Sequence, residues 1–220
     1  MPINSTARTD TGCKTTGGDD RRVTLDDVGH GFQADDMLYR HISLALLPRH
    51  VYALTGPSGS GKSTLLSIIA GWQTPTEGHV ERHGIHRVGW VFQNPHGTAC
   101  RTVLDHIALP FIAQGSTRSQ ADEQARDLLK AFGLSQRGRS LFRDLSGGEA
   151  QRLMLARGVA SRAELLLVDE PTAQLDLNTS QTVNTYLGNV SLSGAIVVVA
   201  THDSGTRDAC TDVIDLKDYQ

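Results

Sequence analysis

Long apolar runs, paired cysteines and an excess of one charge are all missing from this 220-residue chain. No apolar stretch approaches the ~18 residues that a membrane-spanning helix needs, and the N-terminus lacks the apolar core of a signal peptide. The three cysteines (Cys13, Cys100, Cys210) lie far apart, which suits a reducing cytosol better than a disulfide framework. A net charge of −3 does not suggest binding to nucleic acid or a polybasic patch for an anionic membrane surface. If the protein serves a membrane, we expect it to act through a partner.

The length suits one domain, or a core with a modest insertion. Hydrophobic residues make up 39% of the chain, which is adequate for a packed core of this size. Residues 1–20 are rich in Thr, Gly and Asp and nearly free of large apolar side chains. We therefore predict a disordered tail over 1–20, followed by a single domain over 21–220.

From Arg21 onward, apolar strand patterns alternate with helical ones. The runs "ELLLVDE" and "AIVVVA" are apolar without interruption, as parallel strands buried on both faces are. The predicted strands, beside short ones around Gly84, are Val51–Gly56, Val88–Phe92, Glu164–Glu170, Ala195–Ala200 and Asp212–Leu216. This alternation predicts an α/β layered core.

Between Thr98 and Leu145 the pattern becomes helical. Apolar residues recur at helical spacing, and Gly133 stands where a C-terminal cap belongs. The recurring residues are Ala121, Ala125, Leu128, Leu129 and Phe132. We therefore expect a helical insert in the α/β core.

The stretch "GPSGSGKST" matches a phosphate-binding loop in full, with a strand before it and a helix after it. Its glycines let several backbone N–H groups point inward at phosphate oxygens, and the helix start adds its positive dipole end. Lys62 is placed to reach the β- and γ-phosphates of a nucleotide, and the Ser63 hydroxyl to bind Mg²⁺. The candidate residues are Gly56, Pro57, Ser58, Gly59, Ser60, Gly61, Lys62, Ser63 and Thr64.

Polar residues close the strands beside this loop. Asp169 and Glu170 end an apolar strand, at the sheet edge where α/β proteins bind ligands. Asp169 is the candidate to hold Mg²⁺, and Glu170 the candidate to polarise the attacking water. His202 and Gln93 also follow strands: the His is a candidate to position that water, and the Gln amide oxygen to join the Mg²⁺ shell. Taken singly, two adjacent acids are as compatible with solvated surface, and a lone His with a structural role.

The histidines His79, His83 and His86 have a spacing that would suit a metal on one helix face. Gly84 interrupts them, and the surrounding sequence predicts strand and turn. We expect no metal site there.

A second phosphate-type turn, "LSGGEAQR", begins at Leu145. Together with the phosphate loop, Gln93, "LLLVDE", "AQLD" (Ala173–Asp176) and "ATHD", it resembles the ATPase subunit of ABC transporters, from about Val23 to the end of the chain. "LSGGE" followed by Gln-Arg is highly specific to that family. The stretch "LDHIALPFIAQG" is similar to the branch that serves lipoprotein release, macrolide efflux and haem export.

The resemblance implies a P-loop NTPase core with a mostly parallel sheet, a β subdomain and an inserted helical subdomain. The core would span 21–93 and 146–220, and the helical subdomain 94–145. In this family two chains pack head to tail, so that each ATP lies between one chain's phosphate loop and the other chain's signature. The family also implies that Phe32 stacks on the adenine, at a position where relatives usually have Tyr. The signature residues Ser146, Gly147, Gly148 and Glu149 would contact the nucleotide of the other chain, and Asp176 would reach across the interface.

The resemblance implies an ATP-hydrolysing subunit that works as a homodimer and uses ATP and Mg²⁺. It would drive separate membrane permeases from the cytoplasmic face of the membrane, and the expected transporter is an exporter. One alternative is a soluble ABC ATPase in DNA repair or on ribosomes. Such proteins carry long coiled-coil inserts or tandem ATPase halves, which are absent here, and the charge argues against nucleic acid. Another alternative is the ATPase of a membrane signalling complex without transport, which the sequence leaves open.

Overall fold

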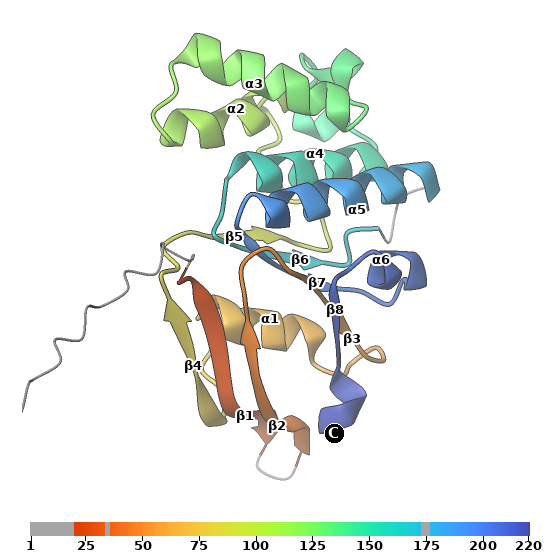
Figure 1. Cartoon of the computed structure of the whole chain (residues 1–220). Helices are drawn as coiled ribbons and strands as arrows, with labels where there is room; N and C mark the ends of the chain where they lie inside the picture. Colours follow the sequence, from red (N-terminus) through yellow and green to blue (C-terminus); the bar gives the residue numbers. More distant parts are fainter. Residues whose placement is uncertain (1–19, 34–35, 173–176) are drawn as a thin grey trace, which may run out of the picture.

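The computed structural model of the chain describes residues 20–33, 36–172 and 177–220, and it stacks strands and helices in layers (Figure 1). A parallel sheet lies at the centre, in the strand order β5-β6-β7-β3-β8. Its strands are β3 (Val51–Thr55), β5 (Val88–Val91), β6 (Leu165–Asp169), β7 (Ile196–Ala200) and β8 (Asp212–Asp215). They match the five predicted strands to within one residue at each end, so the α/β fold class is confirmed.

The central strands β6 and β7 are buried on both faces, as their uninterrupted apolar sequences predict. Successive side chains of a strand point to opposite faces. Leu165 and Leu167 therefore pack into one apolar cluster, while Leu166 and Val168 pack into the other. The sheet separates the two halves of the hydrophobic core.

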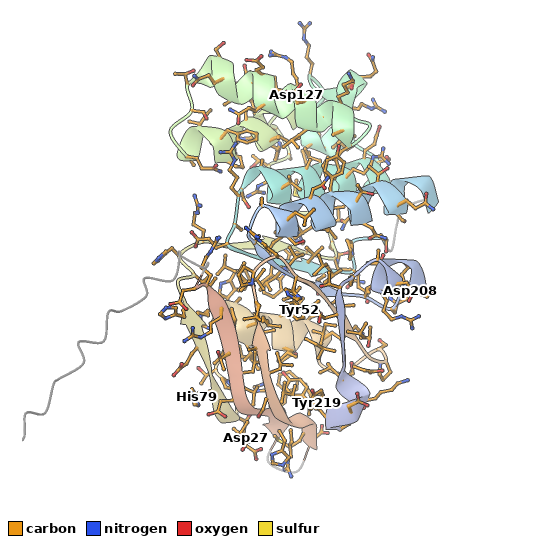
Figure 2. All side chains as sticks on the ribbon, in the orientation of Figure 1. Asp27, Tyr52, His79, Asp127, Asp208 and Tyr219 are labelled. Atoms are coloured by element: carbon orange, nitrogen blue, oxygen red, sulfur yellow. The ribbon has the colours of Figure 1, made fainter. Side chains whose placement is uncertain are left out.

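One of these halves lies between the parallel sheet and a second, antiparallel sheet. The second sheet contains β1 (Arg22–Gln33), β2 (Asp36–Leu46) and β4 (Glu77–His83), in the order β2-β1-β4. Helix α1 (Lys62–Ala70) runs between the two sheets, and side chains fill the space around it, with the labelled Tyr52 among them (Figures 1 and 2). The antiparallel sheet is the predicted β subdomain, and the end of β1 brings Phe32 toward the loop before α1.

The other half of the core lies under helices. Helices α4 (Gly147–Ala160) and α5 (Leu177–Leu192) cover this face, and α2 (Val103–Ala113) and α3 (Arg118–Ala131) lie beyond them (Figure 1). The shorter helices are η1 (Ser135–Arg137), η2 (Phe142–Asp144), α6 (Ser204–Asp208) and η3 (Leu216–Tyr219). In the part of the chain that is described, no helix has both the length and the apolar character needed to cross a membrane.

Helices α2 and α3 are the predicted helical insert. The side chains of Ala121, Ala125 and Leu129 face inward and are buried, as their spacing predicts. Gly133 has a φ of 67° just beyond the helix, a left-handed conformation that glycine adopts without a steric penalty. The predicted cap is therefore confirmed.

His106, on α2, holds the segment that leads into the insert. The ring is 3% exposed; its Nδ1 donates to the Thr102 carbonyl at 2.8 Å, and its Nε2 accepts the Thr98 N–H at 3.0 Å. Both contacts need the neutral ring with its proton on Nδ1. Burial lowers the pKa of His106 below 6.5, against the opposing hydrogen bond to Thr102, and the nearby Arg157 and Arg101 lower it further.

We expect the free energy of unfolding to fall as the pH drops below about 6.5. Below that pH the unfolded chain binds a proton at His106 that the folded chain resists, so the unfolded state gains stability. Urea titrations of the wild type and of His106→Gln, between about pH 7.5 and pH 5.5, measure this effect. The variant should be less stable at the upper pH but should lose less on acidification. Exposed His41, replaced in the same way, is the control; an identical pH slope in wild type and His106→Gln would contradict the assignment.

Candidate functional site

The loop between β3 and α1 curls tightly around the ammonium group of Lys62. Gly56, Gly59 and Gly61 have φ values of 147°, 82° and 90°, which side chains with a Cβ rarely adopt. Lys62 Nζ donates to the carbonyl of Gly56 at 2.9 Å and to that of Pro57 at 3.1 Å. The sequence pattern GxxxxGK[ST] therefore produces the local backbone that a phosphate-binding loop needs.

A cavity of about 670 Å³ opens above this loop, and most of the predicted site residues meet in it. This volume lies in the range of small-molecule sites. The predicted residues in its wall are Phe32, Ser58, Gly59, Gly61, Lys62, Ser63, Thr64, Gln93, Asp169, Glu170 and His202. Leu38 of β2 joins them, although no motif in the sequence points to it. Gly56, Pro57 and Ser60 belong to the loop without lining the cavity.

Asp169 lies at the end of β6, next to the helix that follows the loop. Ser63 Oγ donates to Asp169 Oδ2 at 2.7 Å. Burial raises the pKa of Asp169; the Ser63 hydrogen bond opposes that shift, and the neighbouring Glu170 charge adds to it. A hydroxyl and a carboxylate held together, with the Gln93 amide in the same wall, are the oxygen donors that Mg²⁺ prefers.

Glu170 and His202 form a pair at the same edge of the sheet. His202 Nδ1 lies 2.8 Å from Glu170 Oε2, and the backbone N–H of His202 donates to the same oxygen at 3.4 Å. Glu170 has a φ of 47°, uncommon for a residue with a side chain, while its N–H donates to the Ala200 carbonyl of β7. The Glu170 side chain is 9% exposed and that of His202 69%, so the carboxylate sits within the wall and the imidazole at the mouth.

Phe32, at the end of β1, also lines the cavity. It is 71% exposed, and its ring meets the edge of His30 at a centroid distance of 5.5 Å. His30 accepts a hydrogen bond from Gln73 at Nε2, 2.8 Å, and its Nδ1 lies 3.2 Å from Thr76 Oγ1. An exposed aromatic face on a fixed support is suited to stacking against a planar ring.

The signature "LSGGE" lies outside this cavity, at the start of α4. Ser146 is the N-cap of the helix and forms a capping box with Glu149: Glu149 Oε2 accepts from Ser146 N and from Ser146 Oγ, both at 2.9 Å. Gly147 and Gly148 provide the first helical N–H groups. The hydrogen bond from Ser146 N, helped by Arg137, lowers the pKa of Glu149 to about 2. Asp176, the remaining predicted contact, lies outside the described residues.

A second cavity, of about 480 Å³, lies between β5, α2 and α4. The apolar stretch Ile107–Gln114 contributes both to the core and to the edge of this cavity. Ile107, Ala108 and Phe111 are buried, whereas Pro110 lines the cavity. The stretch thus packs mainly inside the insert and reaches the cavity at Pro110.

Three stacked aromatic rings at this second cavity were not predicted. Trp72 stacks on Trp90 at a centroid distance of 4.6 Å, and Trp90 on Phe92 at 5.3 Å. Trp72 and Phe92 are 61% and 44% exposed. The rings come from the turn after α1 and from the β5 segment, so no single periodic pattern marks them; the available signal was that both tryptophans and Phe92 fall within residues 72–92.

Comparison with known proteins assigns the family. Residues 39–173 match the family model described as ABC transporter. Over 200 residues the chain is 36% identical to the lipoprotein-releasing system ATP-binding protein LolD of Granulibacter bethesdensis, covering 82% of this chain and 87% of that protein. It is also 36% identical to LolD 2 of Caulobacter vibrioides, with 84% and 89% covered. The solved ATP-binding cassette MJ0796, a dimer bound to ADP and Pi, superposes with a TM-score of 0.78 at 28% identity, over 88% of this chain and 94% of that one. The chain thus belongs to the ABC transporter family, as an ATP-binding ATPase subunit.

Proposed function

We propose that the chain is the ATP-hydrolysing subunit of an exporter, which dimerises around two MgATP and drives a separate membrane permease from the cytoplasmic face. The main support for this proposal is that one chain carries two separate phosphate-type sites, the loop cavity and the signature at the start of α4. The cavity above the loop holds Lys62 and Glu170, whereas Ser146 stands exposed outside it. The similarity to lipoprotein-releasing ATP-binding proteins supports the exporter branch.

In this proposal the first cavity binds the nucleotide. The loop N–H groups and Lys62 hold the phosphates, and Phe32 stacks on the adenine. Glu170 polarises the attacking water, and His202, in contact with its carboxylate, keeps that water next to the γ-phosphate. The ordered acid–imidazole pair costs no reorganisation at the moment of reaction.

Ser63, Gln93 and Asp169 would hold the Mg²⁺. They fit it because a hydroxyl, an amide and a carboxylate offer oxygen ligands, and because the hydroxyl and the carboxylate already lie 2.7 Å apart. When bound, the ion neutralises charge on the phosphate oxygens. The chain's own contribution is to keep Asp169 next to the loop, at the end of a strand buried on both sides.

The signature would complete the site of a second chain. Ser146 and the N–H groups of Gly147 and Gly148 lie at the start of a helix, where the dipole favours an anion such as a γ-phosphate. Asp176 would cross the interface and couple the two sites. The dimer of MJ0796 supports this arrangement. The helical insert over 94–145, which lies between Gln93 and the signature, would rotate when ATP joins the two sites, while 21–93 and 146–220 form the nucleotide-binding core.

The second cavity would receive a short cytoplasmic helix of the permease. Phe92 lines it and is 44% exposed, and Trp72, which stacks on Trp90, is 61% exposed. Pro110 and Met154 add apolar atoms to the wall. Exposed aromatic side chains at an apolar cavity are typical of an interaction site. Exposed Arg157 also lines the cavity and, within the described part of the chain, has no carboxylate within 4 Å. The occupant we infer is therefore apolar along one face and carries a carboxylate.

Trp72→Glu is expected to uncouple the ATPase from the permease. The added charge disrupts the stacked aromatic surface, and interface positions of this kind commonly contribute about 2 kcal/mol or more to binding. ATPase rates measured with and without the co-purified membrane protein should show the partner's effect lost and basal hydrolysis unchanged. Leu192→Glu, at a similarly exposed apolar residue at the end of α5, is the matched control. Equal partner response in both variants would contradict docking at this cavity.

The proposed function is tested by purifying the chain with its membrane partners. We expect a permease to co-purify and to change the ATPase rate, and nucleotide with Mg²⁺ to drive dimer formation. Full turnover of the chain alone, with no membrane protein captured, would overturn the transporter role and favour a soluble ATPase.

A further inference from the structure

Both carboxylate oxygens of Glu149, the glutamate of the signature, accept hydrogen bonds from neighbouring residues. Oε2 accepts from the N–H and the hydroxyl of Ser146, and Oε1 accepts from Arg137 Nε at 2.7 Å. The side chain is 16% exposed. Glu149 therefore points back toward the start of its own helix.

Arg137 is placed by the helical insert. It ends η1, where its N–H donates to the Leu134 carbonyl at 2.9 Å and its carbonyl accepts from Ser140 N at 2.8 Å. Leu134 is 1% exposed, and its own N–H returns to Leu129 of α3 at 2.7 Å. The backbone of Arg137 is thus fixed to α3, and only its side chain reaches across to α4.

We propose that Arg137 is a positioning residue that orients Glu149 and Ser146 of the signature. This inference rests on the dimer of the proposed function. Arg137 holds Glu149 Oε1 so that Oε2 stays on Ser146, and it thereby fixes the helix start whose N–H groups meet the partner chain's γ-phosphate. A free glutamate has three rotatable side-chain bonds, and a charge-assisted hydrogen bond at one oxygen restricts them. The nucleotide cavity of the same chain does not include Arg137.

Two consequences separate positioning from general stabilisation. Without Arg137 the ATP-dependent dimer should weaken roughly tenfold, the scale of one charge-assisted hydrogen bond. The affinity of the monomer for nucleotide should stay the same, because Lys62 and the loop are untouched. Arg137→Lys should recover part of the loss, since the ammonium keeps the charge but not the planar donor geometry.

The experiment uses the full chain with Glu170→Gln, in which the ATP-bound dimer is expected to accumulate. Dimer dissociation with ATP and Mg²⁺ is measured by analytical ultracentrifugation for this parent and with Arg137→Ala or Arg137→Lys added. Fluorescent-nucleotide titration at low protein concentration reports binding by the monomer. Arg118→Ala is the matched control, because Arg118 of α3 is a similarly exposed insert arginine, in an ion pair with Asp122 at 2.8 Å.

We expect a weaker dimer in Arg137→Ala, an intermediate one in Arg137→Lys, parental behaviour in Arg118→Ala, and unchanged nucleotide affinity in all. An unaffected dimer in Arg137→Ala overturns the positioning role while the proposed function stands. An equal loss in Arg118→Ala, or lost nucleotide binding, also overturns it, since general destabilisation of the insert would then be the cause. A parent chain that stays monomeric with ATP overturns the proposed dimer itself and the role of Arg137 with it.

Discussion

Glu170→Gln is expected to abolish ATP turnover while leaving ATP binding intact. The carboxylate is held in the cavity wall against His202, at the end of β6, where it is placed to polarise a water molecule. Binding depends instead on the loop around Lys62, which the substitution does not touch. Loss of such a general base commonly lowers the rate by ~10²–10⁴. Phosphate release measures the rate, and size-exclusion chromatography with ATP should show the dimer accumulating.

Glu123→Gln is the control for this experiment. Glu123 is an exposed carboxylate on α3, outside the nucleotide cavity, and its loss should change neither turnover nor dimerisation. If Glu170→Gln hydrolyses ATP at a rate near that of the wild type, Glu170 is not the group that activates water. His202 would then be the next candidate, because its imidazole lies beside the Glu170 carboxylate at the mouth of the cavity.

The parallel sheet and its loop are predictable because each depends on local sequence. Uninterrupted apolar runs mark β6 and β7, since a strand buried on both faces cannot alternate. The loop needs glycine at 56, 59 and 61, where φ is positive, so its sequence pattern records the backbone directly. Residues at the ends of neighbouring parallel strands then meet at one edge, which brings Asp169, Glu170 and His202 together.

The antiparallel sheet and the aromatic stack are less visible in the sequence. Strands β1 and β2 are joined with several register shifts, and the burial of β2 does not alternate strictly, so the period of two is lost. Trp72 and Trp90 meet only after α1 and β4 have brought them together. Arg137 and Glu149 likewise come from different elements and form their ion pair only in the folded chain. Side-chain periodicity reports the face of one element, not which distant residue will lie against it.

Ser146→Arg should also abolish hydrolysis, but through the dimer. Ser146 is exposed at the start of α4, outside the cavity that contains Lys62, so a guanidinium there would obstruct the close approach of a partner chain's γ-phosphate. The variant also loses the N-cap hydroxyl, which costs about 1 kcal/mol, a modest part of the stability of a domain. We therefore expect a folded monomer that binds nucleotide normally, does not dimerise with ATP, and has a hydrolysis rate near background.

The measurement that distinguishes the two halves of the site is nucleotide affinity at low protein concentration. Ser119→Arg adds the same bulk and charge at an exposed position of α3 and should leave dimerisation and hydrolysis unchanged. If Ser146→Arg loses nucleotide binding while a thermal melt shows it folded, the signature serves the nucleotide of its own chain. Intact binding together with a lost dimer means that the serine belongs to the other chain's ATP. In that case each chain carries half of two sites, and neither half hydrolyses ATP alone.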